Sequence, residues 1–208
     1  MKLRHILIII MAVVILGLCS LATPSAASFF DNFNSENGGN DAGCYTGFAN
    51  WNVTKGSVDL CGVSPWNFMP SSYGMYVDLD GSSWRAGRME TKTTFGPGSY
   101  VVSFDLGGSQ RGNTNTVDVY FDSKLATITL GSSVPFTTYT YDVTLVAPAK
   151  LVFDEWDTWN SYGGGSINMG LLLDNVGVQT VPLPPTALLL GSGLVGLVLL
   201  RRKWSLKK

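Results

Sequence analysis

The chain of 208 residues has a length that suits one domain, and its 14 basic and 15 acidic residues leave a net charge of −1. The charges are unevenly distributed, because all 15 acidic residues lie between Asp31 and Asp174, and residues 28–180, with seven basic residues, carry a net charge of −8. An acidic region of this kind argues against nucleic-acid binding, which needs a basic surface.

Residues 1–27 have the features of a secretory signal peptide. Lys2 and Arg4 precede an unbroken apolar run at residues 6–18, and small residues at 25–27 offer a cleavage site before Ser28. The apolar run is short for a transmembrane helix, which needs about 20 residues. The sequence therefore predicts an exported protein that is cut by signal peptidase.

The only histidine of the chain, His5, lies within this signal peptide. The exported part therefore has no histidine for a Ser-His-Asp or Cys-His catalytic centre, or for a histidine-ligated zinc ion. An enzyme built from residues 28–180 would depend on carboxylates, tyrosine or lysine alone. We expect no catalytic residues and no enzymatic activity.

Two cysteines, Cys44 and Cys61, remain after removal of the signal peptide. An even pair of cysteines in an exported chain predicts a disulfide. The alternative is a two-cysteine metal site, for which there is no supporting histidine.

Short runs of alternating apolar and polar residues follow, separated by glycine, proline and asparagine. The clearest run, residues 100–106, places Val102, Phe104 and Leu106 on one face. Comparable runs occur at residues 116–121, 126–130, 139–146, 150–153 and 170–179. No segment between residues 28 and 181 shows an apolar stripe of helical period. The pattern predicts an all-β fold, an antiparallel β-sandwich.

Aromatic residues gather in the loop-like stretch 154–166, which contains Trp156, Trp159 and Tyr162. Trp84 and Trp66 lie in other loop-like stretches and could join them. Aromatic rings stack on the apolar faces of sugars, so these residues are candidates for carbohydrate contact. The alternative is that the tryptophans close the ends of the sandwich and contribute to its core.

The same stretch contains three carboxylates, Asp154, Glu155 and Asp157. A glycosidase needs two carboxyl groups that flank the scissile bond, and only Glu155 and Asp157 could share one face of a strand. We expect a solvated acidic loop in preference to a catalytic pair.

The C-terminal residues have the features of a membrane anchor that stops the export of a chain. Val181, Pro182, Leu183, Pro184 and Pro185 precede an apolar segment at residues 187–200. Counted from residue 181, the segment reaches the length of a transmembrane helix. Basic residues follow it, and with those at the N-terminus they place both tips in the cytoplasm and residues 28–180 outside. The basic residues that follow directly are Arg201, Arg202 and Lys203.

This C-terminal segment, residues 181–208, resembles the bacterial PEP-CTERM sorting signal, with Leu183 in place of the glutamate of that pattern. The resemblance implies recognition by an exosortase and delivery to the cell surface or the extracellular space, with a transient membrane anchor. It covers only the end of the chain and implies nothing about the activity of residues 28–180.

The central region resembles jelly-roll domains of the galactose-binding-like type. The similar segments are residues 31–34, 51–53, 76–81, 98–106 and 170–176. This resemblance implies a jelly-roll sandwich, and a structural calcium ion that joins the first strand to the last. Asn34, Glu36 and Asp174 are the corresponding candidate ligands, and oxygen ligands of this type suit calcium. We expect no other cofactor.

Three hypotheses for the function follow. The leading one is a non-enzymatic structural or adhesive module of the cell surface or extracellular matrix. The second is a carbohydrate-binding module for extracellular polysaccharide, and the third is a glycosidase that uses carboxylates alone.

Overall fold

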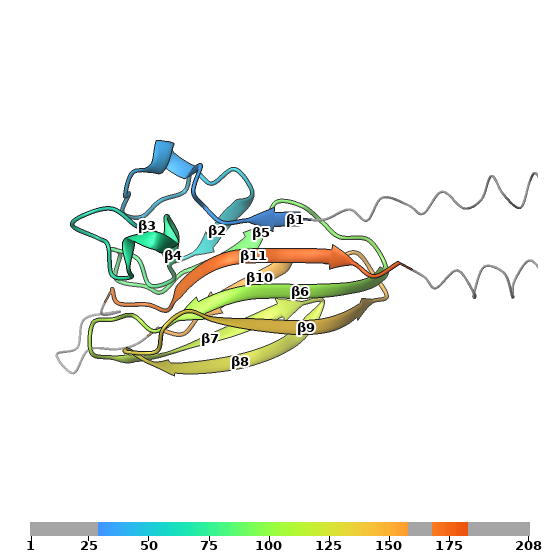
Figure 1. Cartoon of the computed structure of the whole chain (residues 1–208). Helices are drawn as coiled ribbons and strands as arrows, with labels where there is room; N and C mark the ends of the chain where they lie inside the picture. Colours follow the sequence, from blue (N-terminus) through green and yellow to red (C-terminus); the bar gives the residue numbers. More distant parts are fainter. Residues whose placement is uncertain (1–28, 158–167, 183–208) are drawn as a thin grey trace, which may run out of the picture. The chain divides into compact units, whose positions relative to one another are not determined.

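The structure is a computed structural model that describes residues 29–157 and 168–182 (Figure 1). Its strands form two antiparallel sheets that pack face to face. Sheet A has the order β3-β4-β11-β6-β9, with β1 also paired to β11, and sheet B has the order β2-β5-β10-β7-β8. The predicted all-β antiparallel sandwich is therefore confirmed.

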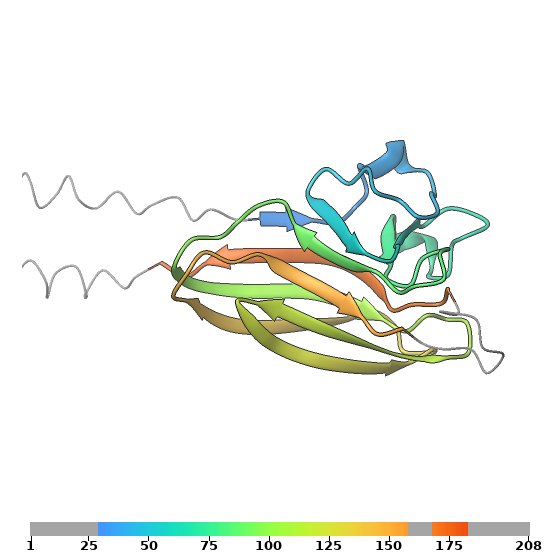
Figure 2. The ribbon, with the colours of Figure 1, turned by 180° about the vertical axis from the view of Figure 1, so that it is seen from behind.

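The strands are β1 (Phe29–Asp31), β2 (Trp51–Lys55), β3 (Asp59–Cys61), β4 (Tyr76–Asp78), β5 (Arg88–Thr91), β6 (Gly98–Gly107), β7 (Thr114–Phe121), β8 (Ser123–Gly131), β9 (Thr137–Leu145), β10 (Leu151–Glu155) and β11 (Leu172–Thr180). Two short 3-10 turns, Glu36–Gly39 and Ser71–Tyr73, complete the described structure. Sheet A lies on the near side in Figure 1, and sheet B on the near side in Figure 2.

The main core lies between the sheets and consists of the inward residues of the alternating strands. Val102, Phe104 and Leu106 of β6 are fully buried, as predicted. Phe104 meets Phe153 of the opposite sheet edge to face, with ring centroids 5.0 Å apart. Each such side chain stabilises the fold by about 1.5–3 kcal/mol through burial alone.

A second apolar cluster lies on the outer face of sheet A. Leu172 points away from the main core, because its neighbours Leu171 and Leu173 both point into it. Leu172 packs instead with Cys61, Met69 and Tyr76. The segment between β3 and β4 thus covers one end of this outer face.

The predicted disulfide between Cys44 and Cys61 is wrong, since both thiols are free. Ala42 pairs with Leu60 in an antiparallel bridge, so Asp41, and not Cys44, lies opposite Cys61. Gly43 and Cys44 are turn residues beyond this bridge, and Cys44 has a φ of +49°. This register does not bring the two thiols together.

No helix among residues 29–157 and 168–182 is long and apolar enough to span a membrane. The predicted signal peptide lies outside the described residues. So does the sorting signal after Pro182, including Leu183, Pro184, Pro185, Arg201 and Arg202.

Candidate functional site

The outer face of sheet B carries two adjacent rows of polar and aromatic side chains. The inward neighbours Met89, Val119 and Phe153 are fully buried, so the residues between them point outward. The registers of β5, β10, β7 and β8 align these outward residues across the sheet. One row is Glu90, Val152, Tyr120 and Lys124, and the next is Arg88, Asp154, Asp118 and Thr127.

Asp118 is the central acceptor on this face. Its carboxylate accepts hydrogen bonds from Lys124 Nζ at 2.8 Å, Thr127 Oγ1 at 2.5 Å and Trp156 Nε1 at 3.1 Å. Burial alone would raise the pKa of Asp118, but these three hydrogen bonds outweigh it and lower the pKa to about 2. Asp118 is therefore ionised at neutral pH and holds these donors in place, together with the Tyr120 hydroxyl, which donates to it at 3.2 Å.

Trp156 stands at one end of the face with its ring accessible. The side chain is 53 % exposed, although its Nε1–H group is bonded to Asp118. Its backbone N–H donates to the Thr116 carbonyl oxygen at 2.9 Å, which extends the pairing of β10 with β7 by one residue. Hydrogen bonds thus hold both the backbone of Trp156 and the polar edge of its indole ring. The apolar surface of the ring remains available for contact.

Tyr120 is the second aromatic residue on this face, and it lies between two cations. The guanidinium carbon of Arg88 is 5.5 Å from the ring centroid, and Lys124 Nζ is 5.6 Å from it. These distances are typical of cation–π contacts. A depression of about 340 Å³ adjoins the ring, and it is lined by Arg88, Tyr120, Asp122, Pro148, Ala149, Lys150 and Val152.

Ion pairs neutralise most of the charges on this face. Asp154 accepts from Lys55 Nζ at 2.6 Å and from Arg88 Nη1 at 2.8 Å, and Lys150 Nζ lies 2.6 Å from Glu90. Lysine and arginine are thus concentrated here, in a region that is otherwise strongly acidic. The face offers many hydrogen-bonding groups with little net charge.

Trp84, another predicted sugar contact, is 69 % exposed and belongs to the loop before β5. This loop is tied to the residue that follows Trp156, since Asp157 accepts from the Ala86 N–H at 2.8 Å and lies 3.7 Å from Arg85 Nη2. The structure therefore brings the segments of Trp84 and Trp156 to one end of sheet B. Trp159 and Tyr162 lie outside the described residues.

Trp66 does not join these residues, because it packs against the second apolar cluster on sheet A. Tyr120, Asp118 and Arg88 were not among the predicted site residues. The alternation of residues 116–121 places Asp118 and Tyr120 opposite the apolar face, which was the available signal.

The three clustered carboxylates do not form a solvated loop, since Asp154 and Glu155 belong to β10. Glu155 points into the sandwich and is fully buried. It accepts from Asn115 Nδ2 at 2.6 Å and from the Leu171 N–H at 3.0 Å. Burial raises the pKa of Glu155 well above its usual value. Glu155 and Asp157 therefore do not flank a common accessible position, as a glycosidase pair must.

The candidate calcium ligands hold other partners. Asn34 Oδ1 accepts from the Met75 N–H at 2.7 Å, and Glu36 Oε1 accepts from the Ala49 N–H at 2.8 Å. Asp174 Oδ1 accepts from the Asn175 N–H at 2.7 Å. Within residues 29–157 and 168–182, no group of three acidic, histidine or cysteine side chains is arranged as a metal site. Each of the three candidate ligands thus has a hydrogen-bond partner within the protein.

No family model and no curated protein matches the sequence. Solved structures similar to the fold include the CBM22-2 xylan-binding domain of Xyn10C from Paenibacillus barcinonensis, with a TM-score of 0.45 and 10 % identity, over 74 % of this chain and 99 % of that one. The CBM6 domain of the laminarinase LamC from Zobellia galactanivorans has a TM-score of 0.37 and 14 % identity, over 74 % and 99 % of the two chains. CBM35 from Paenibacillus barcinonensis has a TM-score of 0.38 and 16 % identity, over 69 % and 100 %.

The leading expectation for the function is corrected at this point. The chain was expected to be a structural or adhesive module, whereas the similar structures are described as carbohydrate-binding modules, which agrees better with the alternative that the sequence analysis kept. At these identities the similarity concerns the fold alone.

Proposed function

We propose that the sandwich is a carbohydrate-binding module that holds a glycan against the outer face of sheet B. The observation that carries this proposal is the exposed Trp156, fixed at its Nε1–H group by Asp118. A rigid aromatic ring loses little conformational entropy on binding and stacks on the apolar face of a sugar. The function is binding without catalysis, in keeping with the burial of Glu155.

The polar groups beside Trp156 suit the hydroxyl groups of a sugar. Asp154 and Arg88 lie side by side in one row, and their partly exposed oxygen and nitrogen atoms can accept and donate at the same level of the sheet. The depression beside Tyr120 continues the surface along the strands and can receive a neighbouring sugar unit. An open surface of this kind accommodates the interior of a polysaccharide chain.

The test is binding of the full-length protein to soluble xylan, laminarin and β-mannan by affinity electrophoresis and tryptophan fluorescence. We expect Trp156→Ala to weaken binding of the preferred glycan by about tenfold, which corresponds to about 1.4 kcal/mol. The matched control is Val146→Ala, which removes an apolar side chain that is 82 % exposed and should bind as the wild type does. Binding unchanged by Trp156→Ala, or no binding to any of the three glycans, would refute the proposal.

We also infer that the module works outside the cell, after export through the N-terminal signal and sorting at residues 181–208. The support is the order of proline block, apolar segment and basic tip in the sequence. The intact mass of protein from a host with and without its exosortase tests this inference. Loss of the segment after about residue 181 only when exosortase is present would support it, and retention of the basic tip in both strains would contradict it.

A further inference from the structure

The outer face of sheet A carries a second surface with an exposed aromatic ring. Phe30 of β1 is 62 % exposed, whereas its neighbour Phe29 packs against Trp51 in the main core. The strand registers align Phe30 with Gly177 of β11, Ser103 of β6 and Thr140 of β9. The ring therefore stands at the end of a row of small and hydroxyl-bearing residues.

Gly177 is the residue that gives this row its open shape. A Cβ atom at this position would lie 3.8 Å from Phe30 Cδ2 and 2.9 Å from Ser103 Oγ. The absence of a side chain thus leaves the space beside the phenyl ring free. A flat molecule can reach the ring across β11 without meeting a large side chain in this row.

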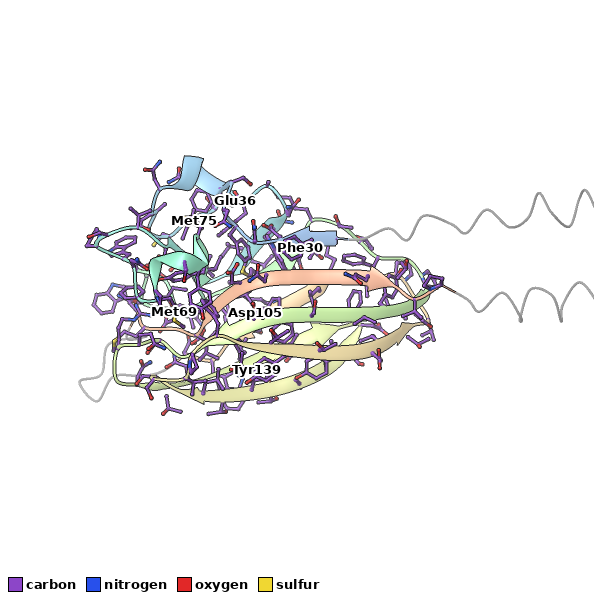
Figure 3. The ribbon with its side chains drawn as sticks, viewed as in Figure 1. Phe30, Glu36, Met69, Met75, Asp105 and Tyr139 are labelled. Carbon is purple, nitrogen blue, oxygen red and sulfur yellow. The ribbon has the colours of Figure 1, made fainter. Side chains whose placement is uncertain are left out.

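The next row along the strands is polar and hydrogen-bonded. Asp105 of β6 accepts from Thr138 Oγ1 at 2.5 Å and from Asn175 Nδ2 at 2.9 Å. Asp105 and Thr138 face each other across β6 and β9. Two residues of a strand separate this row from that of Phe30, a distance of about 7 Å. Phe30 and Asp105 are labelled in Figure 3 on the same side of sheet A.

Beyond the polar row, the second apolar cluster covers the same face of the sheet. Phe136 lies against Tyr73, with ring centroids 5.0 Å apart, and it approaches Gly107 of β6 together with Met69. The exposed part of sheet A thus has aromatic rings on two sides and hydroxyl, amide and carboxylate groups between them. This combination of apolar rings and convergent polar groups is typical of carbohydrate-binding surfaces.

Charge distinguishes this surface from the face of sheet B. In the described part of the chain, no ion pair involves Asp105 or Asp174, whose carboxylates lie on neighbouring strands. Residues 28–180 carry a net charge of −8. An anionic polysaccharide would be repelled here, whereas the hydroxyl groups of a neutral sugar can donate to the partly exposed carboxylate of Asp105, while Asp174 is buried beneath the surface.

We propose that the outer face of sheet A, centred on Phe30 and Asp105, is a second binding surface for a neutral polysaccharide. The proposal rests on the carbohydrate-binding function assigned to sheet B. Because the two surfaces lie on opposite outer faces of the sandwich, one domain can hold two separate chains (Figures 1 and 2). The protein is then a cross-linker of neutral polysaccharide.

The experiment compares the full-length wild type with Trp156→Ala, Phe30→Ala and the double variant on the neutral glycan that the wild type prefers. Affinity electrophoresis measures binding, and light scattering measures cross-linking of a high-mass fraction of that glycan. We expect each single variant to retain binding, weakened about fivefold or more, and to lose cross-linking. The double variant should not bind. Val146→Ala is again the control, and circular dichroism verifies that each variant is folded.

The outcomes separate the two proposals. Wild-type behaviour of Phe30→Ala, or complete loss of binding in Trp156→Ala alone, would overturn the second surface and leave the first. Loss of binding in Phe30→Ala with full binding in Trp156→Ala would overturn the site on sheet B and retain the surface on sheet A.

Asp105→Ala gives a second measurement of the surface on sheet A, since it removes the central acceptor and leaves Phe30 in place. No reduction of binding in Asp105→Ala would also count against the second surface.

Discussion

Asp118 connects the stability of the outer face of sheet B with the position of its principal aromatic residue. The carboxylate holds Trp156, Lys124 and Thr127 at once, and these residues come from the end of β10 and from β8. A hydrogen bond to a charged group contributes about 1.5–3 kcal/mol when it is protected from water, and less at a partly exposed position. A single side chain therefore fixes the geometry of the proposed contact surface.

We predict that Asp118→Ala lowers the free energy of unfolding by about 1–2 kcal/mol at neutral pH. The folded-state pKa of Asp118 is about 2, below the ordinary value of 3.8, so its contribution is complete above about pH 4 and disappears as the pH falls through 2. Urea denaturation of both proteins at about pH 7 and at about pH 2 tests this. A difference that stays constant over this range would contradict the assignment.

Glu155 gives the opposite pH dependence. Its folded-state pKa is raised by burial, so its contribution to stability is complete below its ordinary value of 4.5 and is lost as the pH rises. Glu155→Gln resembles the protonated acid in shape and cannot ionise. We predict that this variant gains stability relative to the wild type between about pH 4.5 and pH 8, as measured by thermal unfolding. A parallel pH dependence of the two proteins would show that Glu155 does not titrate in this range.

At the scale of strands and turns, backbone conformation is decided at a few glycines. Gly56, directly after β2, has a φ of +56°, and a Cβ atom there would collide with the Ala86 carbonyl oxygen. Gly112 also has a positive φ, of +96°, but nothing lies within 4 Å of the corresponding position. A comparison of alanine substitutions at the two glycines thus separates the cost of a left-handed backbone from the cost of a steric clash.

We predict that Gly112→Ala costs about 1–2 kcal/mol, the usual penalty for a side chain at positive φ. Gly56→Ala should cost clearly more, because the pairing of the segment at Ser57 with Ala86 would have to shift as well. Chemical denaturation of the two variants gives the comparison. Equal losses at the two positions would mean that the turn after β2 adapts without strain.

The sequence predicted the long strands well and the short ones poorly. Strands β6 to β11 correspond to the six alternating runs, with bounds that differ by a few residues. Strands β1 and β3, of three residues each, are too short to show a period of two. The predicted disulfide failed for a related reason, since the register between residues 42 and 60 cannot be read from a single sequence.

The candidate site was predicted only in part, because its residues come from distant strands. Trp156 and Trp84 were recognised as aromatic residues in loop-like stretches, and the fold places both at one end of sheet B. Arg88 and Asp154, which are 66 positions apart in the chain, become neighbours only through the pairing of β5 with β10. Such contacts depend on strand order, which local patterns do not specify.

At the scale of the whole molecule, the balance of charge determines how the protein responds to salt. The face of sheet B is largely neutralised by its own ion pairs, and the surface on sheet A is proposed to bind an uncharged ligand. We predict that affinity for the preferred neutral glycan changes less than about twofold between about 0.05 M and 0.5 M NaCl. Titration calorimetry at the two concentrations measures this. A loss of tenfold or more would indicate that charge attraction dominates binding.

The unpaired cysteines provide the molecule with two chemically distinct labels. Cys44 is exposed, whereas Cys61 is buried between Met69, Tyr76 and Leu172, and burial raises the pKa of its thiol above the ordinary value. A maleimide dye should therefore attach at Cys44 in the native protein and at Cys61 only when the segment over sheet A opens. The rate at which Cys61 reacts then measures how often this segment opens. A dye at Cys44 leaves both proposed glycan surfaces unmodified.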